Sequence, residues 1–177
     1  GPNYYPLCQN EMDKYYNCIT DAGCDVLLEV AFDLSEFDDE EWEAFYKSHG
    51  AEKCVSLDTA ADNCIYDKYY KEADDFADKV LSCIEAHNEA TPDNRINTIY
   101  AMEYLSTEYD ASILCHEDAH SFLTCAVNLT CDQLMANISV EGIVGEDFGN
   151  CNTSYNAQKA CLVQKLKENG DIEDSDH

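Results

Sequence analysis

The sequence predicts an all-α protein, a disulfide-stapled helical bundle built from two internally repeated helical hairpins. Three observations support this fold class. Eleven cysteines fall within 177 residues, and eight of them repeat one spacing. Apolar residues recur at the three- and four-residue intervals typical of a helix. The three prolines and seven glycines are too few for a chain rich in β-turns.

The repeated spacing leaves nine residues between two cysteines. Placing residue 8 over residue 115 aligns three successive cysteines without a gap, which indicates an internal duplication. Two cysteines ten positions apart lie about 15 Å apart along a helix and near one face. Two such helices packed antiparallel can therefore be joined at both ends. The expected disulfides are Cys8–Cys64, Cys18–Cys54, Cys115–Cys161 and Cys125–Cys151.

This arrangement resembles the twin CX9C helical hairpin of the small coiled-coil-helix–coiled-coil-helix proteins of the mitochondrial intermembrane space. The resemblance covers four short segments and concerns local geometry alone. We call each pair of cysteines separated by nine residues a clasp: Cys8/Cys18 and Cys54/Cys64 in the first half, and Cys115/Cys125 and Cys151/Cys161 in the second. The present chain departs from the family pattern by its longer connectors and by a third cysteine after the first clasp of each half, Cys24 and Cys131. The resemblance therefore implies twin CX9C-like hairpins and carries no function.

Three cysteines remain outside these clasps. If residues 54–83 form one continuous helix, Cys83 lies about 43 Å from its beginning. That is too far from Cys24 for a disulfide, which needs Cα atoms within about 7 Å. We therefore expect the repeat-equivalent pair Cys24–Cys131, with Cys83 as the odd thiol. Cys83 would then form an intermolecular bond in a dimer, or alternatively stay buried and reduced.

The first half of the chain contains three predicted helices before its second clasp. The helix that begins at Cys8 should stop before Gly23, and residues 25–32 form a short second helix. The acidic run from Asp38 to Glu41 has the pattern of a capping box and should begin a third helix. That helix ends near Gly50.

The rest of the chain continues the helical pattern. Its longest periodic stretch runs from Leu57 to Cys83, and Thr91-Pro92 offers an N-cap followed by proline at the first helical position. A final helix is expected from about Thr153 to Asn169. The predicted segments are a first repeat (1–90), a connecting helix (91–114), a second repeat (115–170) and an acidic disordered tail (171–177).

Cysteine content and sequons indicate the compartment. A small chain with this many cysteines is typical of a disulfide scaffold made in an oxidising environment. Three N-glycosylation sequons, at Asn128, Asn137 and Asn152, agree with a secreted glycoprotein. No apolar run reaches the roughly 18 residues of a membrane span, so membrane insertion is not expected.

The charge is strongly one-sided, with 37 acidic residues against 10 basic ones and a net charge of −27. Repulsion disfavours nucleic acid and anionic membrane surfaces as partners. A basic protein or a cationic ligand would be attracted, although the simplest role of this charge is solubility.

One short motif suggests catalysis. His116, Glu117 and His120 match the H-E-x-x-H pattern, in which two histidines one helical turn apart hold zinc and the glutamate acts as a general base. The pattern is weak here, because the metzincin extension would need Gly and His where Leu123 and Ala126 stand. We expect no catalytic residue and no cofactor, and keep a zinc metallopeptidase as a remote alternative.

Aromatic residues are the better candidates for recognition. Tyrosine, of which there are twelve, is amphipathic and suited to interfaces and to cation–π contacts. The predicted binding surface comprises Tyr16, Trp42, Tyr69 and Tyr70. The predicted function is recognition of another protein, one with a basic face, by a secreted acidic module. The alternative is a carrier that holds a small apolar or cationic ligand in a cavity near Trp42 and Phe76.

Overall fold

The computed structural model describes residues 4–140, 142–143 and 145–170, and it is helical throughout apart from one minimal hairpin. The chain divides into two compact units, 1–68 and 69–177. The division falls inside a π-helical turn, Tyr66–Tyr70. Each unit has its own buried apolar cluster, so each is described by itself.

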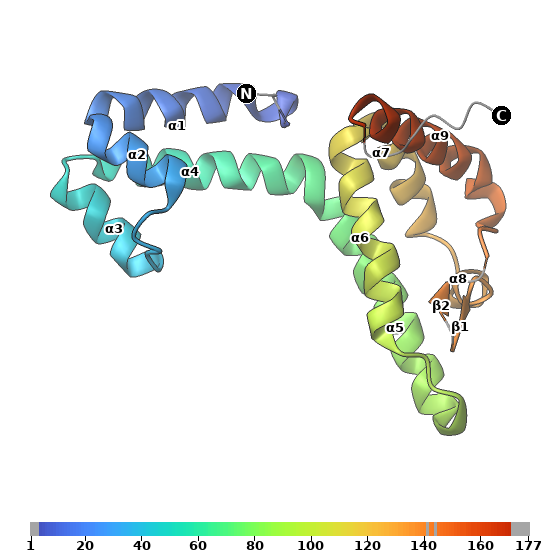
Figure 1. The fold of residues 1–177 in the computed structure, drawn as a ribbon. Helices are drawn as coiled ribbons and strands as arrows, with labels where there is room; N and C mark the ends of the chain where they lie inside the picture. The colour runs from blue at the N-terminus through green and yellow to red at the C-terminus, as the bar shows by residue number, and fades with distance from the viewer. Residues whose placement is uncertain (1–3, 141, 144, 171–177) are drawn as a thin grey trace. The chain divides into compact units, whose positions relative to one another are not determined.

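The first unit is a pair of long helices with two shorter helices in the connection between them (Figure 1). Its long pair is α1 (Gln9–Ala22) and α4 (Glu52–Ile65), and the connection contains α2 (Cys24–Phe32) and α3 (Asp39–Ser48). A short 3-10 turn, Pro6–Cys8, precedes α1. The Cys8–Cys64 and Cys18–Cys54 disulfides join α1 to α4 at both ends, which requires the two helices to be antiparallel.

Local sequence signals explain where these helices begin and end. Gly23 adopts φ 120°, a conformation that side chains rarely reach, and it separates α1 from α2. The Asp38 side chain accepts a hydrogen bond from the Glu41 backbone N–H, and the Glu41 side chain accepts one from the Asp38 N–H, both at 2.9 Å. The predicted capping box is therefore confirmed, and α3 begins at Asp39 as this box requires.

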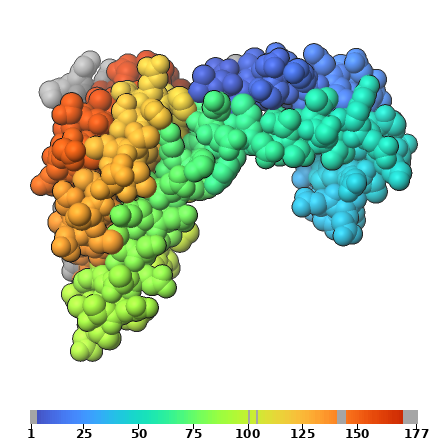
Figure 2. All heavy atoms as spheres, turned by 180° about the vertical axis from the view of Figure 1, so that it is seen from behind, coloured from blue at the N-terminus to red at the C-terminus, as the bar shows by residue number. Residues whose placement is uncertain are grey.

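The second unit is larger and contains the remaining helices (Figure 1). They are α5 (Lys71–Ala90), a 3-10 turn (Pro92–Asn94), α6 (Thr98–Leu114), α7 (His116–Ala126), α8 (Cys131–Met135), a second 3-10 turn (Gly149–Cys151) and α9 (Asn152–Glu168). Two short strands, β1 (Ile138–Ser139) and β2 (Gly142–Ile143), pair antiparallel after α8. The space-filling view in Figure 2 shows the segment around α8 directly against α5.

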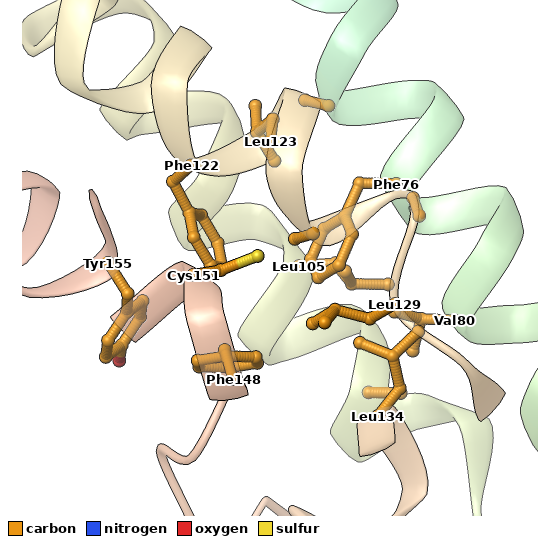
Figure 3. Packing of buried hydrophobic residues seen from close by; sticks show 14 of the residues in the cluster. Phe76, Val80, Leu105, Phe122, Leu123, Leu129, Leu134, Phe148, Cys151 and Tyr155 are labelled. Atoms are coloured by element: carbon orange, nitrogen blue, oxygen red, sulfur yellow. The ribbon is translucent and has the colours of Figure 1, made fainter. Parts of the chain in front are cut away.

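Aromatic rings packed edge-on and tilted against one another form the centre of the second unit (Figure 3). Phe122 of α7 is fully buried, and its ring centroid lies 5.8 Å from that of Phe76, 5.2 Å from Phe148 and 5.2 Å from Tyr155. These separations are those of favourable edge and tilted ring contacts. Because the rings come from four separate segments, they fix α5, α7 and α9 around one core.

Five disulfides cross-link the chain, two within the first unit and three within the second. The four predicted clasps are present, with Cα–Cα distances between 5.7 and 6.0 Å. They close loops of 26 to 56 residues, for which the chain-entropy model gives about 3–4 kcal/mol of stabilisation each. The α1–α4 and α7–α9 helix pairs are therefore each joined by two disulfides.

The prediction for the remaining cysteines is wrong. The fifth disulfide is Cys83–Cys131, with Cα atoms 5.3 Å apart, and Cys24 is the free, exposed thiol. The expected continuous helix through 54–83 is interrupted by the π-helical turn, after which α5 belongs to the second unit and packs against α8. Cys24 and Cys131, which the repeat pairing joined, lie in different units.

Other boundaries also differ from expectation. Residues 69–90, assigned to a first repeat, and α6, assigned as a connector, both pack inside the second unit. Thr91 makes no side-chain cap for the 3-10 turn after it, and α6 begins only at Thr98, capped by the Asn97 side chain. The predicted acidic tail, 171–177, lies outside the described residues. Within the described part of the chain, no helix is long and apolar enough to span a bilayer.

Candidate functional site

The H-E-x-x-H motif lies on the first two turns of α7, where both histidines have protein partners. The half-buried His116 ring packs against Tyr69, with centroids 5.0 Å apart, and its Nδ1 lies 3.3 Å from the Ser112 carbonyl oxygen. The exposed His120 places Nδ1 2.6 Å from a carboxylate oxygen of Glu72 on α5. The two rings therefore take part in aromatic packing and in a hydrogen bond with a carboxylate.

A zincin centre would need a third ligand beside these histidines. Among the described residues, no three His, Cys, Asp or Glu side chains gather in a way that would hold a metal ion. Glu117, the residue that would act as a base, is exposed on the same helix. The described geometry thus gives no support to a metallopeptidase.

The predicted aromatic binding surface is divided between the two units. Tyr16 is 49 % exposed and suited to contact, whereas Tyr69 is only 3 % exposed and belongs to the core of the second unit. Tyr70 is half-buried beside Tyr109, with ring centroids 6.0 Å apart. The assignment of Tyr69 to a surface is therefore wrong, because its side chain packs inward on α7.

The three sequons differ in their surroundings. Asn128 is exposed after α7, with one hydrogen bond from its Nδ2 to the Thr124 carbonyl. Asn152 is half-buried at the start of α9, where its Oδ1 accepts from the Phe148 N–H at 2.6 Å. Asn137 is only 3 % exposed, and both ends of its amide are hydrogen-bonded to the backbone. Of the three, Asn128 presents the most accessible amide for a glycan.

Helix α2 exposes a stripe of apolar side chains, which we call the α2 stripe: Cys24, Leu27, Leu28, Ala31 and Phe32. At 100° per residue these positions fall on one face, opposite the inward-facing Val26 and Val30. Leu28 is 49 % exposed and Phe32 67 % exposed. Because monomeric proteins rarely leave such contiguous apolar surface uncovered, the stripe has the character of a contact surface.

Acidic residues flank the α2 stripe. Asp25 and Glu29 lie on one side of the helix, and the loop after it contains Asp33 and Glu36. Asp33 has φ 44° and Glu36 has φ 49°, both left-handed conformations that non-glycine residues seldom adopt. The stripe is thus an apolar surface with an acidic rim.

The first unit also contains a pocket of about 510 Å³ among its four helices. It lies on the inner side of α2, so the pocket and the α2 stripe are on opposite faces of that helix. Four carboxylates and three aromatic rings dominate its wall. The lining residues are Tyr15, Val30, Asp39, Trp42, Glu43, Tyr46, Val55, Asp58, Thr59 and Asp62.

The aromatic side of the pocket is held rigidly. Trp42 contacts Phe37, Phe45 and Tyr46, with ring centroids 5.3 to 5.9 Å apart. At its base the buried hydroxyls of Tyr15 and Tyr46 hydrogen-bond to each other at 2.7 Å. The rings therefore present a preformed surface between α1 and α3.

The acidic side of the pocket lacks compensating charge. Asp58 and Asp62 are one turn apart on α4, and no lysine or arginine is among the described residues that line the pocket. Burial raises the pKa of Asp58 above its usual range, and the nearby Asp62 carboxylate raises it further. Burial likewise raises the pKa of Tyr15 and of Tyr46, and the negative charge of Asp58 adds to both increases. The pocket is therefore a region of negative potential.

Sequence reasoning expected a cavity near Trp42 and Phe76, and the structure separates these two residues. Trp42 lines the pocket, whereas Phe76 is 1 % exposed in the packed core of the second unit. The contribution of Asp58 and the Tyr15–Tyr46 pair was not anticipated. The i, i+4 spacing of Asp58 and Asp62 on a predicted helix was the available signal.

Comparison with protein-family models, with curated proteins and with solved structures finds no match to this chain.

Proposed function

We propose that this protein is a secreted, acidic, non-catalytic binding protein that recognises another protein through the α2 stripe. The observation that carries the proposal is the exposed apolar face of α2, on which Leu28 and Phe32 are about half and two thirds exposed. Interaction surfaces of soluble proteins combine such an apolar centre with a polar rim.

The rim indicates the chemistry of the partner. Asp25 and Glu29 lie on one side of the apolar side chains, Asp33 and Glu36 lie in the loop that follows them, and the whole chain carries a net charge of −27. The complementary surface is an apolar patch ringed by lysine and arginine, on a basic protein. Long-range attraction between the two would speed their association and would weaken as salt is added.

The compartment and origin of the chain belong to the same proposal. Five intramolecular disulfides are typical of proteins made in an oxidising compartment, which supports secretion. The α1–α4 and α7–α9 pairs, each riveted twice with nine residues between cysteines, support descent from one duplicated twin CX9C-like hairpin. A glycan at Asn128 would lie in the second unit, away from α2 in the sequence.

The free thiol of Cys24 provides a direct test, because it lies one helical turn before Leu28 on the α2 stripe. A photo-reactive maleimide is attached to Cys24, and the labelled protein is illuminated in the extracellular fluid of its source. We expect a covalent adduct with a basic protein, which mass spectrometry then identifies. The adduct should disappear when Leu28→Asp and Phe32→Asp are introduced together.

The matched control moves the label to another exposed apolar position. The variant Cys24→Ser with Ile99→Cys places the same reagent on α6, at a residue that is 61 % exposed. Equal adducts from both positions would show non-specific capture and refute the proposal. An adduct between two copies of this chain would refute it as well, since the stripe would then be a homotypic interface.

A further inference from the structure

The pocket of the first unit has two chemically different walls. Helix α4 contributes the carboxylates of Asp58 and Asp62, whereas α1 and α3 contribute the Trp42 ring and the Tyr15–Tyr46 pair, beside two further carboxylates on α3. A volume of about 510 Å³ falls in the range of small-molecule sites. A ligand that satisfies both walls must carry a positive charge on an apolar body.

Electrostatics narrow the ligand class further. Two carboxylates one turn apart on a helix repel each other when no cation lies between them. Asp58 is only half-exposed, so it has lost part of its hydration as well. Aromatic rings attract organic cations through their electron-rich faces, most strongly in tryptophan. The pocket thus carries negative charge that a bound ammonium group would neutralise.

We propose that this pocket binds a small organic cation, a protonated amine on an aliphatic or aromatic body. In the complex Asp58 and Asp62 hold the ammonium group, and Trp42 covers the apolar part. Anionic ligands are repelled by the same carboxylates. A bare divalent metal ion is disfavoured, because the described residues contain no cluster of three metal-ligating side chains.

Intrinsic fluorescence can report this binding directly, because Trp42 is the sole tryptophan of the chain and lies in the pocket wall. The full-length protein is titrated with 2-phenylethylamine, with its neutral analogue 2-phenylethanol and with the anion 3-phenylpropionate. We expect a saturable fluorescence change with the amine, at least tenfold weaker binding of the alcohol, and no binding of the carboxylate.

Two variants connect the signal to the carboxylates. Asp58→Asn keeps the shape of the side chain and removes its charge, so the amine affinity should fall at least tenfold and approach that of the alcohol. Asp93→Asn, at an exposed position of the second unit, should leave the affinity unchanged. Equal binding of amine and alcohol by the wild-type protein would overturn the proposal, and so would the absence of any saturable signal.

A lysine side chain from a partner protein offers the same ammonium group. Nα-acetyl-lysine methylamide is therefore titrated in parallel. If it binds more tightly than the free amine, the small-molecule assignment is overturned and the pocket becomes a subsite for a protein partner. The variant with Leu28→Asp and Phe32→Asp should retain amine binding, because those side chains face away from the pocket. This variant therefore distinguishes loss of binding to the protein partner from loss of binding to the amine.

Discussion

Replacement of the Asn137 side chain should destabilise the second unit far more than its position in a loop suggests. The side chain is 3 % exposed and joins α8 to the segment before α9. Its Nδ2 donates to the carbonyl oxygens of Gln133 and Asp147, at 3.2 and 2.8 Å, and its Oδ1 accepts from the Asp147 N–H at 2.8 Å. Asn137→Ala removes all three hydrogen bonds.

The expected cost follows from these contacts. A buried hydrogen bond contributes about 0.5–1.5 kcal/mol, so three of them amount to about 2–4 kcal/mol of unfolding free energy. Asn137→Asp should cost at least as much at neutral pH, because a carboxylate oxygen would then face two carbonyl oxygens. The measurement is urea unfolding of the disulfide-intact protein, followed by far-ultraviolet circular dichroism.

Asn128 supplies the matched control for this prediction. It is exposed and has one side-chain hydrogen bond, to the Thr124 carbonyl at 3.0 Å, so Asn128→Ala should cost about 0.5 kcal/mol or less. If the Asn137 and Asn128 variants unfold at the same urea concentration, the argument from buried hydrogen bonds is refuted. The same contrast predicts glycan occupancy at Asn128 and a bare Asn137 in the folded protein, as glycopeptide mass spectrometry would show.

Three further predictions concern the cysteines, the pocket and the zinc motif. A non-reducing peptide map should join Cys83 to Cys131, and Cys24 should react with a maleimide without denaturant; a Cys24–Cys131 peptide would contradict the structure. Because the folded state raises the pKa of Asp58, it binds the proton more tightly than the unfolded chain does, and stability rises as pH falls through that raised pKa. Asp58→Asn should therefore raise the urea midpoint of the ligand-free protein at neutral pH, and this gain should vanish below the ordinary aspartate pKa. An unchanged midpoint at neutral pH would show that the Asp58 charge does not destabilise the folded protein. Elemental mass spectrometry of chelator-free protein should find no stoichiometric zinc, whereas one zinc per chain, lost in His116→Ala, would restore the metallopeptidase hypothesis.

The clasp disulfides could be predicted because helix geometry alone determines which cysteines meet. Cys8 and Cys18 are ten residues apart on one helix, and Cys54 and Cys64 repeat that interval on its partner. The capping box at Asp38 could be predicted as well, since its hydrogen bonds join residues three positions apart. Such local rules need no knowledge of tertiary packing.

The Cys83–Cys131 bond could not be predicted in the same way. The apolar period continues through Tyr66–Tyr70, but the backbone there forms a π-helical turn and the contacts of the chain change from the first unit to the second. Alignment of the two halves of the sequence as a predicted repeat then favoured Cys24 as the partner of Cys131. Tertiary packing of α5 against α8 decides the pairing, and no feature of either segment alone reveals it.

Both units are cross-linked by disulfides, but they differ in the size of their apolar cores, and this difference bears on where binding sites can form. In the second unit, α5, α7 and α9 pack around Phe122 and its neighbouring aromatic rings, and the unit buries a large apolar cluster. The first unit has a much smaller cluster, and small cores supply little net stability. Two disulfides at the ends of the α1–α4 pair compensate for this by restricting the unfolded chain. Because these two disulfides supply part of the stability of the first unit, α2 and α3 can leave a charged pocket open on one side and apolar side chains exposed on the other.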